Sequence, residues 1–168
     1  MVVEKGKKEK QMTRPLTHDE LSSLSFFLRD NQPALKLALD IIYVSHLWDD
    51  LIDGDVDRSA DDINNAFIKA FRSIPNNIFY QSLPEIAKQQ LNGLIISAAM
   101  QYKDSTQLEL GDEDDRFMAF VIRNAILGII HYLMLLVGGE EWIDEQGVLF
   151  WRTFGLKGQY LEYVEEGV

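Results

Sequence analysis

Apolar residues recur every three or four positions along most of the chain, the spacing that places them on one side of an α-helix. The first such stretch follows Thr17, and Thr17 with Glu20 three residues later is the pattern of a capping box. We expect this helix to run to about Asp30. Its apolar stripe comprises Leu21, Leu24, Phe27 and Leu28.

Two further helices are predicted before residue 80. Proline is tolerated in the first turn of a helix, so Pro33 indicates the start of a second helix, which runs to Asp53. Ser59 and Asp62 form the capping pattern of a third helix, and Pro75 ends it. The predicted buried residues of the third helix are Ile63, Ala66, Phe67, Ala70 and Phe71.

A fourth helix is expected to open at Pro84 and to reach about Lys103, and the acidic segment 104–115 is predicted to be a loop. The buried face of this helix is expected to comprise Ile86, Leu91, Leu94, Ile95, Ala98 and Ala99.

Two helices are predicted in the last third of the chain. One runs from about Asp115 to Val137 and is closed by Gly138 and Gly139, since glycine readily adopts the left-handed conformation that ends a helix. The other covers residues 140–165, with glycines at which it would bend or break. These glycines are Gly147, Gly155 and Gly158.

The pattern therefore predicts an all-α protein: a single-domain bundle of about six helices over residues 15–168. Residues 1–14 are basic and without apolar periodicity, as in a disordered tail. The formal charge of −11 argues against nucleic acid as a partner, because a polyanion would be repelled. The absence of cysteine excludes disulfides and thiol chemistry, and no secretory leader is recognisable, so a cytoplasmic location is expected.

The segment 117–137 is apolar and long enough to cross a bilayer. Arg123, Asn124 and His131 interrupt it, and an arginine at the centre of a span costs about 2.5–3.5 kcal/mol. We therefore expect the central helix of a soluble bundle and no membrane span. With Arg116 these residues form a polar stripe that would face either the aspartates described next or a second subunit in a homodimer.

Three aspartates, Asp49, Asp50 and Asp53, occupy the last turn of the second predicted helix. A helix C-terminus carries partial negative charge, so carboxylates gathered there require a positive partner. Oxygen ligands grouped in this way suit Mg²⁺, which keeps several waters and accepts the phosphates of a substrate. We therefore predict that the three aspartates are metal ligands and that the metal binds a small-molecule diphosphate.

His46 shares the arc of the aspartates and would orient a ligand or transfer a proton, although a histidine near an apolar face is more often a core residue. Arg123 and His131 are the candidates for the opposite wall of the site. A second acidic group, Glu140, Glu141 and Asp144, has the same spacing, but it opens a helix, where the dipole favours acidic side chains without a metal.

Residues 43–53, Y-V-S-H-L-W-D-D-L-I-D, resemble the first aspartate-rich motif of the class I terpenoid synthase superfamily, which includes the isoprenyl diphosphate, squalene and phytoene synthases. The resemblance implies an all-α bundle that holds Mg²⁺ on Asp49, Asp50 and Asp53 and acts on an isoprenoid diphosphate. It covers about a dozen residues. The family's second metal-binding motif is not present, and its catalytic domain is much longer than this chain.

Two other functions fit the same features. All-α nucleotide pyrophosphohydrolases of the MazG and dimeric dUTPase type also carry acidic magnesium ligands on helices, although their E-x-x-E and E-x-x-D pattern is not matched cleanly. The non-enzymatic alternative is an acidic helical assembly protein. Its partner surface would consist of C-terminal aromatic residues, namely Trp142, Phe150, Trp151, Phe154, Tyr160 and Tyr163.

Overall fold

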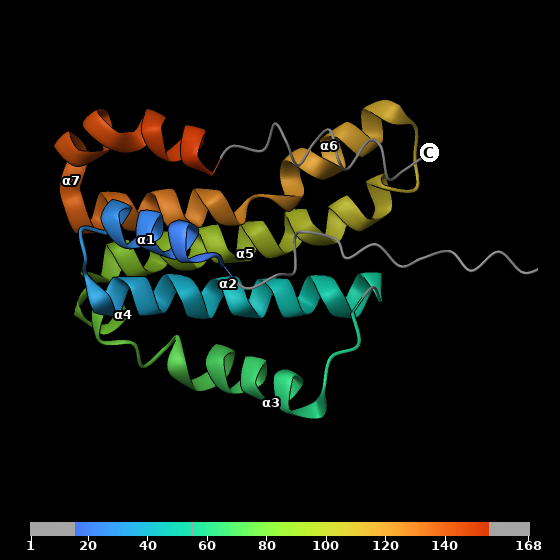
Figure 1. Ribbon diagram of the computed structural model, residues 1–168, viewed down its shortest axis with the longest axis horizontal. Helices are drawn as coiled ribbons and strands as arrows, with labels where there is room; N and C mark the ends of the chain where they lie inside the picture. Colours follow the sequence, from blue (N-terminus) through green and yellow to red (C-terminus); the bar gives the residue numbers. More distant parts are fainter. Residues whose placement is uncertain (1–15, 55, 155–168) are drawn as a thin grey trace, which may run out of the picture.

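The computed structural model describes residues 16–54 and 56–154, and all regular structure in these ranges is helical (Figure 1), which confirms the predicted all-α class. The predicted tail, Gly155, Gly158, Tyr160 and Tyr163 lie outside the described residues. The elements are α1 (His18–Phe27), α2 (Gln32–Asp53), α3 (Ala60–Ile68), the π-helical turn η2 (Lys69–Ser73), α4 (Ile78–Ser82), α5 (Glu85–Leu108), α6 (Glu113–Arg123) and α7 (Ile126–Thr153).

Two of the predicted helix starts, at Thr17 and Ser59, are confirmed by capping contacts. The Thr17 hydroxyl accepts a hydrogen bond from the Glu20 amide at 3.2 Å, while the Thr17 amide donates to the Glu20 carboxylate at 2.7 Å. Ser59 and Asp62 form the same reciprocal box at the start of α3. At the other end of α2, Gly54 has a φ of 65°, and its amide donates to the Asp50 carbonyl at 3.0 Å. Local hydrogen bonds thus satisfy backbone groups at the helix ends.

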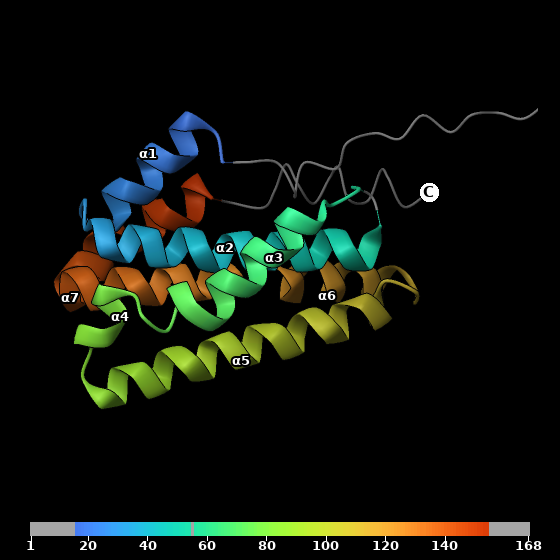
Figure 2. The same ribbon diagram turned by 90° about the horizontal axis from the view of Figure 1, so that it is seen from below.

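The long helices α2 and α5 and the first half of α7 run side by side, as Figures 1 and 2 show. α3 and η2 pack against one side of α2, and α6 packs along α5. α7 changes direction at Gly139, whose φ of 78° and ψ of −177° are not helical, so that its second half folds back toward α1. The predicted break at Gly138 and Gly139 is therefore present as a sharp kink.

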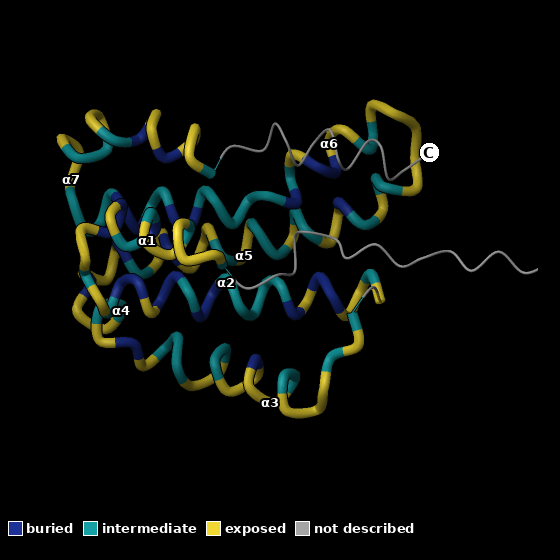
Figure 3. The backbone as a smooth tube through the Cα atoms, viewed as in Figure 1, coloured by how far each residue is buried: buried dark blue, intermediate teal, exposed yellow. Residues whose placement is uncertain are grey.

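The core lies where α1, α2, α5 and both halves of α7 meet (Figure 3). An ion pair joins α2 to η2, because the buried Asp40 carboxylate of α2 contacts Lys69 of η2. The ammonium of the exposed Lys36, also on α2, lies 2.6 Å from the same carboxylate. The fully buried large apolar side chains are Phe27, Leu28, Leu37, Leu91, Leu133, Met134 and Phe150.

The predicted buried face of the third helix is wrong in part. Ala66 is buried, but Phe67 and Phe71 are 55% and 76% exposed and stack on each other with ring centroids 5.8 Å apart. The α-helix also gives way to the π-helical turn η2 after Ile68. A π-turn contains more residues per turn than an α-helix, so the periodicity assumed for an unbroken helix does not continue through it.

The helices after residue 77 differ from expectation in their number and boundaries. α5 continues to Leu108, so residues 104–108 are helical, and Ile86 and Leu94 face solvent. α4 has no predicted counterpart. The helix expected over residues 115–137 is broken at Asn124 and Ala125, where α6 ends and α7 begins.

Among the residues that the structure describes, one stretch, Glu113–Thr153, which comprises α6 and α7, is long and apolar enough to cross a membrane by length and composition alone, and 33% of its most apolar window is buried. Its straight part from Ile126 to the kink at Gly139 is about 20 Å long at 1.5 Å per residue. The hydrocarbon core of a bilayer is about 30 Å thick, so this part is too short to span it in the observed conformation.

Candidate functional site

An apolar cavity of about 540 Å³ lies along α2, α5 and α7. On α5 its lining runs from Asn92 to Tyr102, a rise of about 15 Å along the helix, so the cavity is elongated. Its walls are mainly aliphatic and aromatic, including Ile41, Ile95, Ala98, Leu127, Ile130 and Phe150. We call the part lined by Asp49, Tyr102 and Arg123 the polar end of the cavity.

The residues of the polar end come from three different helices. The Tyr102 hydroxyl of α5 donates a hydrogen bond to Asp49 Oδ1 of α2 at 2.9 Å. Arg123, at the last residue of α6, places its Nε 3.6 Å from the same Asp49 oxygen, and its guanidinium lies over the Tyr102 ring at 5.3 Å. Because Asp49 and Arg123 are both buried, this ion pair is shielded from water.

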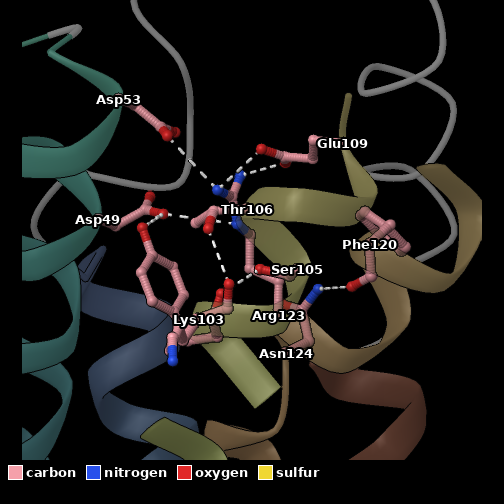
Figure 4. Close-up of polar contacts among 10 residues, drawn as sticks. Asp49, Asp53, Lys103, Ser105, Thr106, Glu109, Phe120, Arg123 and Asn124 are labelled. Atoms are coloured by element: carbon pink, nitrogen blue, oxygen red, sulfur yellow. Dashed lines mark hydrogen bonds and ion pairs between the residues drawn. The ribbon is translucent and has the colours of Figure 1, made fainter. Parts of the chain in front are cut away.

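Arg123 also binds two carboxylates on the outer side of the polar end (Figure 4). Its Nη1 lies 2.7 Å from Glu109 and its Nη2 lies 3.4 Å from Asp53. Three carboxylates therefore surround one guanidinium. Burial alone would lower the pKa of Arg123, but Asp49, Glu109 and Asp53 together outweigh it and raise the pKa, so the side chain is charged.

Asp50 faces a different cation. Its carboxylate is 1% exposed and pairs with Arg58, from the segment between α2 and α3. The positive partner predicted for the aspartates is therefore supplied twice, by Arg123 for Asp49 and Asp53 and by Arg58 for Asp50. Neither arginine follows from the spacing of the aspartates.

This arrangement does not fit a magnesium ion. Adjacent residues on a helix point about 100° apart, and here Asp50 is directed to Arg58 while Asp49 and Asp53 are directed to Arg123. Within residues 16–54 and 56–154 no group of three or more metal-ligating side chains is placed to hold a metal. Binding of Mg²⁺ by the three aspartates stays a prediction that requires both arginines to move.

The two histidines named from the sequence occupy different places. His46 lines the cavity, and burial lowers its pKa against the opposing effect of Asp50, so its imidazole is neutral near pH 7. His131 belongs to α7, where its ring packs on Phe150 and Trp151 at 5.6 and 5.4 Å. His131 is not a cavity-lining residue, so the structure does not bring it together with the aspartates.

The second acidic group follows the kink in α7. Glu140, Glu141 and Asp144 are all exposed and lie in the turns directly after Gly139. This position agrees with the expectation that the group opens a helical segment, where the backbone dipole favours negative charge.

The described C-terminal aromatic residues pack mainly inside the protein. Phe150 is fully buried against Phe27 with ring centroids 5.4 Å apart, and the Trp142 indole donates to the Phe27 carbonyl at 3.0 Å. Trp151 is the exception at 44% exposure. This part of the aromatic group therefore fixes the second half of α7 to α1.

Sequence reasoning missed Tyr102 and Glu109 as members of the site. Burial and the Asp49 carboxylate raise the pKa of Tyr102, so the phenol keeps the proton that it donates. Glu109 lies in the segment 104–115 that the sequence predicts to be a loop, but it follows directly on α5 and contacts Arg123. No sequence motif marks either residue, because each contacts a residue more than ten positions away in the sequence.

Comparison with known proteins adds no relative: no protein-family model, curated protein or solved structure matches the chain. The resemblance to the terpenoid synthase motif therefore stays a prediction from the sequence.

Proposed function

We propose that this protein binds an elongated, mainly apolar small molecule in the cavity between α2, α5 and α7. The observation that carries the proposal is a largely apolar cavity of about 540 Å³ with a smaller number of polar groups in its lining. Sites for small molecules are typically about 300–1,000 Å³ in volume, apolar over most of their walls, and equipped with a small number of polar groups that orient the ligand.

The chemistry of the lining supports an apolar body for the ligand. Ile95, Ala98 and Leu127 offer no hydrogen-bonding side chain, so a polar molecule would lose its hydration there without compensation. Asp49, Tyr102 and Arg123 provide hydrogen-bonding groups at the polar end, and further polar residues such as His46, Tyr80 and Asn92 line other parts of the cavity. A mainly apolar ligand that carries polar groups would match this lining.

Filling the cavity should abolish binding. Ala98→Phe places a phenyl ring in the cavity wall, and we expect the affinity for an apolar fluorescent probe such as diphenylhexatriene to fall by roughly tenfold or more, about 1.4 kcal/mol. Ser97→Phe adds the same ring to the exposed side of the same helix turn and should leave the affinity unchanged. Circular dichroism verifies that both variants are folded. Equal probe binding by the two variants would refute the proposal.

A second candidate is a magnesium-dependent function on an isoprenoid diphosphate. It is favoured by the position of Asp49, which lies at the end of an apolar cavity where the head of a ligand with an isoprenoid tail would lie. In addition, Asp50 Oδ1 is buried and makes no hydrogen bond to any of the described residues. The pyrophosphohydrolase alternative has no such observation in its favour.

The second candidate predicts a thermal shift. Mg²⁺ with farnesyl diphosphate should raise the melting temperature through mass action, by an amount that grows with concentration, because only the folded state would bind both. Asp49→Asn and Asp50→Asn should each remove the shift, whereas Asp144→Asn, in the exposed second acidic group, should retain it. If the wild-type melting temperature does not respond, the magnesium-dependent function is excluded.

A further inference from the structure

One side of α5 faces away from the rest of the protein. α5 lies along one edge of the bundle (Figure 2), and its inner side lines the cavity through residues such as Ile95 and Tyr102. On the opposite side, a set of exposed residues shares an arc of about 100° around the helix, and we call this set the outer face of α5. It comprises Glu85, Ile86, Gln89, Gly93, Ile96, Met100, Lys103, Asp104 and Gln107.

The outer face of α5 has few charges and much exposed apolar surface. The chain as a whole is 26% charged residues, yet it has no charged residue between Lys88 and Lys103. The side chains of Ile86, Ile96 and Met100 project into solvent and are 67%, 64% and 53% exposed. Depletion of charged residues together with apolar side chains and methionine is typical of the central part of a protein–protein interface.

Gly93 leaves a gap near the middle of the outer face. A glycine inside a helix is unfavourable relative to alanine, because it loses more backbone freedom on folding. A Cβ atom at Gly93 would meet open space, so packing within the described part of the chain does not require the missing side chain. A glycine on an exposed helix face does allow the backbone of a second helix to approach closely.

We propose that the outer face of α5 binds the same face of a second copy of this chain, with the two α5 helices antiparallel. A two-fold axis beside Leu94 places Gly93 opposite Ile96 of the second copy, so that a projecting side chain fills each gap. In the same register, Glu85 lies opposite Lys103 of the second copy on the same edge of the face. The face is thus complementary to itself in shape and charge, which favours a second copy as its partner.

The charge of the chain also favours this face for self-association. Two copies with a formal charge of −11 each repel one another, and the repulsion is weakest where the contacting surfaces carry no net charge. α5 meets this condition, because Glu85 and Asp104 balance Lys88 and Lys103. No other charged residue belongs to α5.

The size of the face indicates a weak dimer. α5 has 24 residues and is therefore about 36 Å long, and a helix with its side chains is about 10–12 Å wide, which gives a face of about 400 Å². The two copies together would bury at least about 800 Å², in the range of weak, reversible interfaces. We expect a dissociation constant of about 10–100 μM.

Sedimentation equilibrium of the full chain, at concentrations from about 1 to 500 μM, tests the proposal. We expect a monomer–dimer equilibrium that Ile96→Glu weakens at least about tenfold, because the contact would bury the new carboxylates. Val148→Glu is the matched control: Val148 is 61% exposed on α7, its substitution changes the net charge equally, and dimerisation should be unchanged. A wild-type chain that stays monomeric, or equal weakening by the two substitutions, would overturn the proposal.

A charge reversal tests the antiparallel register. Glu85→Lys places like charges opposite each other at both ends of the contact and should weaken dimerisation by about threefold or more. Addition of Lys103→Glu should restore it, because both ion pairs are then reversed. Within one chain the two positions are about 27 Å apart along the helix, too far for an ion pair of their own. If the doubly substituted chain dimerises no better than Glu85→Lys, the antiparallel contact is refuted.

Gly93→Gln separates association from folding. Glutamine is a better helix former than glycine, so the melting temperature of the diluted, monomeric chain should rise. The new side chain would occupy the gap that receives Ile96 of the second copy, so dimerisation should weaken by about tenfold despite the more stable fold. Dimerisation as strong as that of the wild type would show that the two helices do not approach each other at Gly93.

Discussion

Arg123→Ala should lower the free energy of unfolding by about 3–5 kcal/mol, because removal of one member of a buried ion pair leaves its partners uncompensated in a low-dielectric site. Arg123 contacts Asp49, Asp53 and Glu109, and its side chain is 3% exposed. Without it, these carboxylates would repel one another and the C-terminal end of α2. Urea denaturation followed by circular dichroism measures the change.

The effect should depend on charge and not only on lost packing. Adding both Asp49→Asn and Asp53→Asn to the Arg123→Ala variant removes two of the three uncompensated charges. We expect these two additional substitutions to restore at least about 1 kcal/mol of the lost free energy of unfolding. Arg116→Ala is the matched control on α6 and should change stability by less than about 1 kcal/mol, since its side chain is only partly buried. A loss below 1 kcal/mol in Arg123→Ala would show that the carboxylates do not need this guanidinium.

The position of the aspartates was predictable, but their partners were not. The apolar run before Asp49 and the glycine at residue 54 define where α2 ends, and the dipole argument then requires a cation. Two cations of different origin satisfy that requirement: Arg123 from α6 and Arg58 from the α2–α3 segment. The pairing of each aspartate with one of the two arginines depends on how the helices pack. The spacing of residues within one helix contains no information about that packing.

The break between α6 and α7 shows a similar limit for the fold. Apolar residues continue through residues 117–137, so the pattern predicts one helix, yet the chain turns at Asn124 and Ala125. The Asn124 amide donates to the Phe120 carbonyl at 2.8 Å, and an asparagine that bonds to a nearby carbonyl competes with the helical ladder. Of the residues in the predicted polar stripe, Arg123 contacts Asp49 and Asp53, whereas Arg116 and His131 are not among the cavity-lining residues.

Phe150 connects the stability of the core to the cavity, and Phe150→Ala should lower the free energy of unfolding by about 3–5 kcal/mol. Phe150 is fully buried, packs on Phe27 and Phe154 with ring centroids 5.4 and 5.2 Å apart, and lines the cavity. Its removal should also enlarge the cavity, so an apolar ligand larger than diphenylhexatriene should gain affinity relative to diphenylhexatriene. Leu149→Ala changes the exposed neighbour on the same helix and should alter stability by about 0.5 kcal/mol or less. Urea denaturation measures the free energy of unfolding of both variants. Equal losses in Phe150→Ala and Leu149→Ala would mean that Phe150 does not fix the second half of α7 to the core. The cavity would then lack the wall that defines its size.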